Sequence, residues 1–370
     1  MDFALTDEQT AVRDLAASVL GDHCTPEALR AAEVGDSPGF DRALWAKLAE
    51  AGLLGVCIPE EHGGLGLGLV ELALLLEEAG RTAAPVPLLG GLGLGALAVV
   101  RHGSAAQQAA LLPGVASGEL LVTAALVEPL GDEANPAATA RQDGQSWVLD
   151  GTKICVPAGL FADRILVSAT TPTGAGLFLV DPAAAGVTRE QQDTIAWTPE
   201  ALLVLDGVVA APVGALDGST LADVLQVGRA AVCAVLSGAA EAATRLTGEY
   251  TRTREQFGKP IAMFQAVGQR AADCFIDSRT IRLTMLLAVW RLANGLPAEK
   301  EVAVAKFYAS DAGQRVVRAA AHLHGGMGVS REYPLHRYYV LVKQLELTLG
   351  GGTRSLVQLG RLLAQEPVSA

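Results

Sequence analysis

The sequence is poor in aromatic residues, in cysteine and in net positive charge. Aromatic residues make up 5% of its 370 residues, and 28 basic residues face 40 acidic ones, for a formal net charge of −12. No stretch interleaves basic with aromatic residues, so a nucleic-acid partner is not expected. Hydrophobic residues, in contrast, make up 50% of the chain. This composition predicts a helix-rich globular protein with a large core.

The five cysteines are scattered and form no C-x-x-C pair. Free thiols in a reducing, cytoplasmic compartment are therefore predicted. His322 and His324 stand two residues apart. On a helix that spacing points the two side chains apart, so no metal site is predicted.

Two further signals are rejected. Residues 83–100 carry no charge but contain two prolines and four glycines, which favours a buried core helix over a membrane span. The N-terminus shows no signal-peptide pattern. The glycine-rich strings Gly63–Gly68 and Gly91–Ala96 lack the strand–turn–helix frame of a dinucleotide site.

Residues 1–118 predict an N-terminal helical domain. A cap at Thr6 opens a helix through Leu20, and Asp41–Ala51 forms a short helix that is closed by Gly52. A third helix is expected over Val70–Gly80.

Residues 119–216 predict a compact β domain, because short apolar runs alternate with turn residues. Asp143-Gly144 and Asp150-Gly151 are expected turns. The expected strands are Leu120–Leu126, Trp147–Leu149, Thr152–Val156, Arg164–Ala169, Leu177–Val180 and Leu202–Leu205.

Residues 217–370 predict a C-terminal four-helix bundle. The fold class is then α+β, mainly α, with helical, β and helical domains in that order. The four helices are expected from a cap at Ser219 or Thr220 to Arg252, from Pro260 to Ala293, from Pro297 to Gly325-Gly326, and from Tyr338 onward.

Three motifs at matching spacing support a family resemblance. They are Pro59–Gly64 (PEEHGG), Thr253–Ile261 (TREQFGKPI) with the following Phe264-Gln265, and His324–Gly328 (HGGMG) with the following Glu332–Arg337 (EYPLHR). Together with the α–β–α order, they resemble the acyl-CoA dehydrogenase family over essentially the whole chain. The resemblance implies FAD-dependent α,β-dehydrogenation of an acyl-CoA thioester. It also implies the family fold, with N-terminal helices, a middle β-barrel-like domain and a C-terminal four-helix bundle.

In that family FAD lies across a dimer interface. One subunit's β domain holds the flavin ring, and the neighbour's bundle holds the pyrophosphate and adenine end. The resemblance carries a phosphate-pairing role onto Arg254 and backbone contacts onto Gly325 and Gly326. The other implied cofactor contacts are Gln256, Phe257, Gln265, Thr353 and His322, which stands where the family usually has glutamine.

The motifs that hold the flavin ring in the family are poorly matched in this sequence. The family's Thr-Glu-Pro-type loop is reduced to Val127–Asp132, and the Trp-Ile-Thr triplet becomes Cys155-Val156-Pro157. Proline has no amide hydrogen and cannot donate to a flavin.

The catalytic carboxylate is missing at both positions where the family carries one. These positions fall on Gly351 and on Gly228, and glycine cannot abstract a proton. Glu332 and Glu346 are the nearby acids, but five helical residues turn Glu346 about 140° away from Gly351. Arg229, next to Gly228, is implied as an acyl-CoA contact.

Gly351 and the segment His336–Tyr339 resemble the base-lacking subunit of actinobacterial α2β2 steroid side-chain acyl-CoA dehydrogenases. The resemblance implies a cytoplasmic subunit that binds FAD together with a catalytic partner subunit. It also implies an acyl-CoA substrate, with a steroid side-chain CoA as one candidate, and an electron-transfer flavoprotein as acceptor. Two alternatives stay open: a self-sufficient homotetrameric dehydrogenase with an unconventional base, and a flavin-free acyl-CoA-binding or scaffold protein on the same fold.

Overall fold

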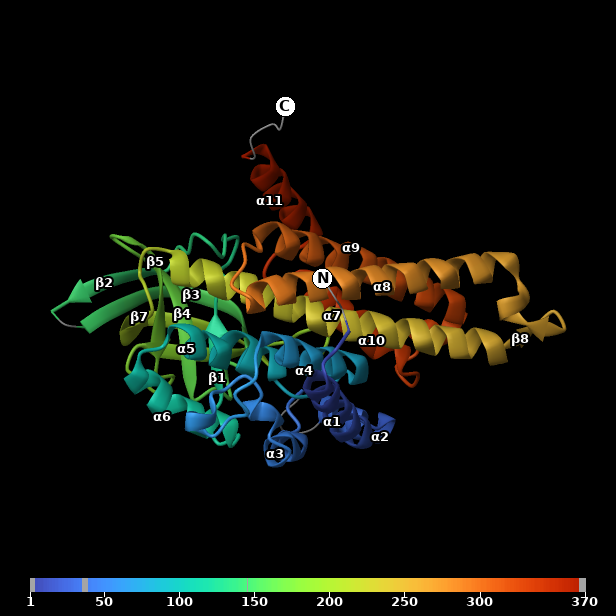
Figure 1. Cartoon of the computed structure of the whole chain (residues 1–370), viewed down its shortest axis with the longest axis horizontal. Coiled ribbons are helices and arrows are strands. Elements are labelled where there is room, and N and C mark those ends of the chain that lie inside the picture. Colours follow the sequence, from blue (N-terminus) through green and yellow to red (C-terminus); the bar gives the residue numbers. More distant parts are fainter. Residues whose placement is uncertain (1–3, 35–38, 145, 366–370) are drawn as a thin grey trace. The chain divides into compact units, whose positions relative to one another are not determined.

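The computed structural model describes residues 4–34, 39–144 and 146–365 (Figure 1). The chain divides into two compact units. We call Met1–Arg13, Ala73–Ala84 and Arg229–Ala370 the helical unit, and Asp14–Leu72 and Pro85–Gly228 the sheet unit. The expected domain boundaries at residues 118 and 216 stay a prediction.

The N-terminal part is helical, as expected. Thr6 Oγ1 accepts the Gln9 amide at 3.2 Å, and Asp41 Oδ1 accepts the Ala43 amide at 2.9 Å, which fixes two helix starts. The uncharged residues 83–100 include a buried π-helical segment, so the prediction of a core helix is confirmed. The elements are α1 (Asp7–His23), α2 (Pro26–Val34), α3 (Arg42–Glu50), η1 (Leu53–Gly55), η2 (Glu60–His62), α4 (Leu69–Thr82), η3 (Leu89–Ala96), α5 (Leu97–His102) and α6 (Ala105–Ala116).

The sheet has seven strands and closes on itself. Strands β4, β2, β3, β7 and β5 pair in that order, and β5 pairs back with β4. Its interior is packed with buried apolar side chains, among them Leu149, Phe178 and Leu203. This is the middle β-barrel of the predicted fold. The strands are β1 (Val122–Ala125), β2 (Thr139–Asp143), β3 (Ser146–Pro157), β4 (Arg164–Thr171), β5 (Gly174–Val180), β6 (Val187–Gln192) and β7 (Glu200–Val213).

The turn expected at Asp150-Gly151 is wrong. β3 runs through it, and the pairing with β7 shifts register between Leu149 and Gly151. The glycine therefore marks a bulge inside one strand, and the two expected runs are one element. Strands β2 and β6 were missed because their residues are mostly polar and exposed. The Asp143-Gly144 turn is confirmed at Gly144, which has φ 61°.

The described C-terminal part contains five α-helices, two short 3-10 helices and a small hairpin. They are α7 (Ser219–Thr253), β8 (Glu255–Gln256), β9 (Lys259–Pro260), η4 (Ile261–Met263), α8 (Gln265–Ala293), α9 (Glu299–His324), η5 (Gly325–Val329), α10 (Leu335–Leu345) and α11 (Gly352–Ala364). The three long helices overlap the expected ones and differ from them mainly at their starts.

Three details of this part were predicted wrongly. Pro260 pairs in β9 instead of opening a helix, and α8 begins at Gln265. The last expected helix begins at Leu335 rather than Tyr338, and it is followed by a separate helix, α11. Ser219 is the first residue of α7 rather than its cap, and Asp217 Oδ1 accepts its amide at 3.0 Å.

α7 is long and apolar enough to cross a membrane, judged by length and composition alone. However, 78% of its most apolar 18-residue window is buried inside the protein. α7 is therefore a core helix.

Helices α4 and α7 cross at backbone contact within the helical unit. A Cβ atom added at Gly238 would lie 1.8 Å from the Glu77 carbonyl oxygen, and one added at Gly80 would lie 2.0 Å from that of Val235. Only glycine allows this approach at both points.

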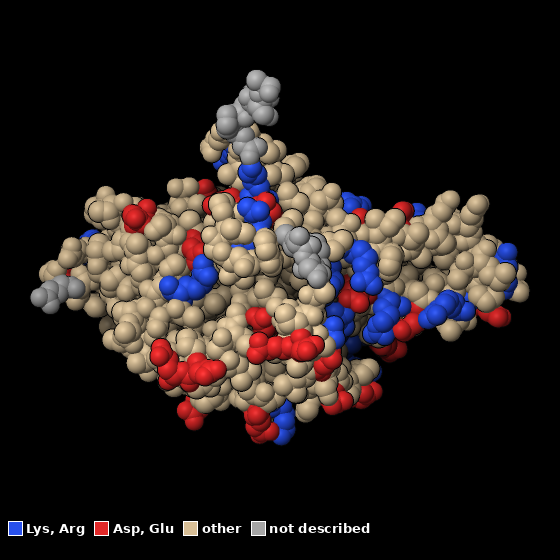
Figure 2. Space-filling view, in the orientation of Figure 1, with Lys and Arg blue, Asp and Glu red and all other residues tan. Residues whose placement is uncertain are grey.

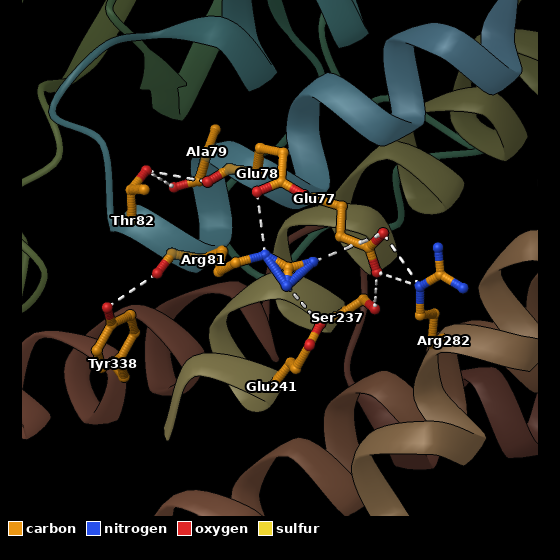
Figure 3. Close-up of polar contacts among 9 residues, drawn as sticks. All are labelled: Glu77, Glu78, Ala79, Arg81, Thr82, Ser237, Glu241, Arg282 and Tyr338. Carbon is orange, nitrogen blue, oxygen red and sulfur yellow. Dashed lines mark hydrogen bonds and ion pairs between the residues drawn. The ribbon is translucent and has the colours of Figure 1, made fainter. Parts of the chain in front are cut away.

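An ionic network centred on two buried glutamates joins the same helices to α8 and α10 (Figure 3). The fully buried Glu77 accepts hydrogen bonds from Ser237 Oγ at 2.6 Å and Arg282 Nε at 3.0 Å. Arg81 binds Glu78 and Glu241, and its carbonyl accepts the Tyr338 hydroxyl at 2.9 Å. Burial raises the pKa of Glu78. These contacts hold the frame that carries the candidate site.

Candidate functional site

Four of the expected cofactor residues lie between the end of α7 and the start of α8, at or beside the β8–β9 hairpin. The hairpin turns at Phe257 and Gly258, with φ values of 55° and 78°. The Phe257 ring is 92% exposed and meets the edge of Phe264 at a centroid distance of 6.0 Å. Arg254 and Gln256 are exposed on the hairpin, and Gln265 opens α8 directly after it.

Charged side chains of both signs lie near this end of the helical unit. In Figure 2, Lys and Arg, with Asp and Glu among them, lie between the middle of the helices and the hairpin. Exposed basic residues of this region are Arg252, Arg254, Arg270 and Arg279. Among the described residues the Arg254 guanidinium has no hydrogen-bond or ion-pair partner, so it can receive a phosphate.

The paired glycines form the turn that ends α9. Gly325 has φ 58° and ψ −136°, a conformation that is essentially restricted to glycine. Both Gly325 and Gly326 are exposed, and a Cβ added at either would meet nothing within 4 Å. Open space over a glycine backbone suits the close approach of a phosphate-bearing ligand. His322 is exposed one turn earlier, whereas His324 is buried, so the two histidines do point apart.

Thr353 lies elsewhere in the helical unit. It is exposed in the first turn of α11, which lies away from the β8–β9 hairpin in Figure 1. The structure thus places the expected contacts in two neighbouring segments and leaves Thr353 apart. Arg254, Gln256, Phe257 and Gln265 lie at the hairpin, and His322, Gly325 and Gly326 lie at the end of α9.

The turn between α10 and α11, which carries Gly351, is held by two cations. The fully buried Lys306 donates to the carbonyls of Leu345 and Glu346 at 3.1 and 3.0 Å. Arg229 Nε donates to the Leu349 carbonyl at 3.0 Å. Cations suit the unpaired carbonyls at a helix C-terminus. The implied acyl-CoA contact of Arg229 stays a prediction.

Position 351 itself tolerates a side chain. Gly351 has φ −86°, and an added Cβ would find its nearest neighbour, Leu347 Cδ2, at 3.6 Å. Gly350, at φ 98°, does need glycine. The fold therefore requires a glycine at position 350 but not at 351.

The two nearby acids differ in their surroundings. Glu346 is buried, and its Oε1 accepts Lys343 Nζ at 2.6 Å and Gln314 Nε2 at 3.2 Å. Glu332 is exposed just before α10. Gly228, the second expected base position, is buried within α7 in the sheet unit.

In the sheet unit, the segment that resembles the flavin-ring triplet has its polar groups occupied. Cys155 lies at a register shift of β3 with φ 52°, and its amide donates to Gln192 Oε1 at 2.6 Å. Burial, together with Glu200, raises the pKa of the Cys155 thiol to about 11. The thiolate form is therefore disfavoured at neutral pH.

The neighbouring loop is anchored by a buried ion pair. Lys153 Nζ donates to Glu128 Oε1 at 2.6 Å and to Ser168 Oγ at 2.9 Å. Burial acts to raise the pKa of Glu128. The hydrogen bonds from Lys153 and from two backbone amides outweigh burial and lower this pKa. Burial also lowers the pKa of Lys153. Leu130, in the same loop, is fully exposed with φ 55°.

Comparison with known proteins decides the family. Residues 6–119 match the family description "Acyl-CoA dehydrogenase, N-terminal domain", and residues 219–362 match "Acyl-CoA dehydrogenase, C-terminal domain". The chain belongs to the acyl-CoA dehydrogenase family. Acyl-CoA dehydrogenases typically use FAD.

Two curated acyl-CoA dehydrogenases of Mycobacterium tuberculosis resemble the chain over nearly its whole length. FadE27 is 38% identical over 99% of this chain and 100% of its own length. FadE28 is 36% identical over 97% of this chain and 98% of its own length.

Two solved structures of the family share the fold closely. A chain of the ChsE4–ChsE5 complex from Mycobacterium tuberculosis matches with a TM-score of 0.94 and 38% identity over 100% of both chains. A variant of the Tcur3481–Tcur3483 steroid acyl-CoA dehydrogenase matches with a TM-score of 0.93 and 44% identity over 97% of this chain and 98% of that one. The chain is thus related to subunits of heteromeric acyl-CoA dehydrogenases.

Several residues of this site were missed from the sequence. They are Tyr250 and Tyr333, which pack against His324, and Lys306 and Gln192, which bind backbone groups. No paired pattern in the sequence marks them, because their partners belong to the backbone or meet them only through the fold.

Proposed function

We propose that this chain is one subunit of a heteromeric acyl-CoA dehydrogenase. It binds the phosphate side of an FAD whose flavin ring and catalytic base belong to a partner subunit. The observation that carries the proposal is Gly351, which stands at the base position in a turn whose backbone and surroundings would accept a side chain. The fold does not require glycine at position 351, so the proposal explains the missing carboxylate by the function of the chain.

The phosphate-side residues fit the cofactor. Arg254 offers an unpaired guanidinium fork, and Gly325 and Gly326 offer open backbone. Phe257 offers a nearly fully exposed ring at the same end of the helical unit. Gln256, Gln265 and His322 add exposed polar groups, and Thr353 is assigned to a separate contact.

The flavin-ring side of the sheet unit supports the division of labour. The Cys155 amide already donates to Gln192, and Pro157 has no amide hydrogen. Two backbone groups of this segment are therefore not free to donate to a ring. The partner's sheet would hold the ring instead.

The proposed reaction is α,β-dehydrogenation of an acyl-CoA thioester. When bound, FAD would be the acceptor for the hydride that leaves the β-carbon. A carboxylate of the partner would remove the α-proton. This chain's residues bind and orient the cofactor. Because one similar structure is described as a steroid acyl-CoA dehydrogenase, we propose a steroid-bearing acyl-CoA as the substrate.

Replacing Arg254 tests the phosphate contact. In the complex of this chain with its partner, Arg254→Ala removes a charge-assisted phosphate contact worth about 1.5–3 kcal/mol, which weakens FAD binding about 10- to 150-fold. Fluorescence titration of the apo complex with FAD measures the loss.

The matched control is Arg245→Ala, in the helix α7 that ends just before Arg254, where an exposed arginine pairs with Glu249. It should change the FAD dissociation constant less than twofold. Equal FAD affinity of the Arg254→Ala and wild-type complexes would contradict the assigned role.

A further inference from the structure

Three aromatic side chains join the two segments that the proposed function assigns to the cofactor. Tyr250 lies in the last turn of α7, His324 ends α9, and Tyr333 precedes α10. The rings of Tyr250 and His324 stack at a centroid distance of 4.3 Å and an interplanar angle of 25°. Tyr333 packs against both, at 6.1 Å from Tyr250 and 5.1 Å from His324. We call these three residues the aromatic clasp.

The hydrogen bonds of His324 fix its tautomer. Nδ1 lies 2.8 Å from the Ala320 carbonyl oxygen, which can only accept, so Nδ1 carries the hydrogen. Nε2 then accepts the Tyr333 hydroxyl at 3.2 Å. Because the side chain is 3% exposed, burial lowers the pKa of His324 and keeps the ring neutral. The ring is thus held on both edges and on one face.

The clasp is connected directly to both cofactor segments. The Tyr250 carbonyl accepts the Arg254 amide at 2.8 Å, and the Tyr250 hydroxyl donates to the His324 carbonyl at 3.4 Å. His324 is followed at once by Gly325. A shift of the histidine ring would therefore move the glycine turn relative to Arg254.

The glycine turn has little freedom to compensate for such a shift. Gly325 is in a conformation that is essentially restricted to glycine, and a Cβ at Gly328 would lie 2.4 Å from the Ala321 carbonyl oxygen. The turn is therefore packed tightly onto α9 on one side and open on the other. Its open side is the side that the proposed function gives to FAD.

We propose that His324, held by Tyr250 and Tyr333, is a positioning residue for FAD, which keeps the Gly325-Gly326 backbone in register with Arg254. None of the three side chains needs to touch the cofactor. The inference rests on the proposed function, because it gives the clasp a role only if this end of the helical unit binds FAD.

The test uses the assembled complex of this chain with its partner subunit. Tyr333→Phe removes one hydroxyl, keeps the ring, and should weaken FAD binding about 3- to 10-fold. His324→Phe keeps the stack, loses both ring hydrogen bonds, and should weaken binding at least as much. The Michaelis constant for acyl-CoA should stay within twofold for both variants, because the clasp is assigned to the cofactor alone.

Two controls separate positioning from general destabilisation. Tyr308→Phe removes a tyrosine hydroxyl on the same helix as His324, where no hydrogen bond of the hydroxyl is seen among the described residues. Ile281→Val trims a fully buried side chain of α8 and lowers the melting temperature as a core change does. Both should leave the FAD dissociation constant within twofold.

The outcomes distinguish the two proposals. If Arg254→Ala weakens FAD binding and both clasp variants do not, the clasp role is wrong and the proposed function stands. If Arg254→Ala also has no effect, the proposed function fails. If Ile281→Val weakens FAD binding as much as Tyr333→Phe does, the effect is one of stability, and the positioning role is overturned.

Discussion

At the scale of single residues, Asp223 shows how a partly buried charge is held in this chain. Its carboxylate accepts Arg101 Nη2 and Nε at 2.6 and 2.8 Å and meets His102 Nε2 at 2.6 Å, all within the sheet unit. Burial acts to raise the pKa of Asp223, but these partners outweigh burial and lower the pKa well below its usual range. The carboxylate is therefore charged in the folded state at neutral pH.

Asp223→Asn should destabilise the protein in a pH-dependent way. A folded-state pKa below the unfolded value of about 3.9 gives stability that is present above that pH and is lost as pH falls through the folded pKa. We expect a loss of about 1–3 kcal/mol at pH 7, which shrinks progressively below about pH 4. Urea unfolding of wild type and variant across this range measures it.

The control is Asp143→Asn, because Asp143 and its partner Arg141 are both exposed and their charged atoms lie 3.9 Å apart. It should cost less than about 0.5 kcal/mol at any pH. A pH-independent loss for Asp223→Asn would show that packing, rather than charge, explains the effect.

At the scale of elements, α7 holds two glycines whose replacement by alanine should have opposite effects on stability. Gly238→Ala would force a Cβ to within 1.8 Å of the α4 backbone, which should cost about 1–3 kcal/mol or separate the two helices. Gly248→Ala, in the same helix, meets nothing within 4 Å and should stabilise it by about 0.5–1 kcal/mol. Thermal melts of the two variants should shift in opposite directions. Two shifts of the same sign would contradict the close crossing.

The elements also show what sequence patterns can and cannot predict. The three long helices follow from their apolar content, and the structure confirms that they exist, although their expected starts were partly wrong. Pro260 misled the prediction because proline favours both a helix start and an edge strand, and only the pairing with Glu255 decides between them. Gly151 misled it in the same way, because a glycine inside a strand can mark a bulge as well as a turn.

At the scale of the whole molecule, the family resemblance gave the architecture and the list of candidate contacts. It could not give the clasp, because Tyr250 and His324 lie 74 residues apart and meet only through the fold. It could not give the cation-held turn either, since Lys306 binds backbone carbonyls and leaves no pattern of paired side chains. Such contacts depend on tertiary packing.

The central claim is that this chain holds only the phosphate side of its cofactor and depends on a partner for the ring and the base. Flavin content measures this directly, by absorbance after purification of the chain alone and of its complex with the partner subunit. We expect a colourless, inactive chain and a yellow complex with one FAD per pair of subunits. A lone chain that carries a full equivalent of FAD and oxidises acyl-CoA would contradict it.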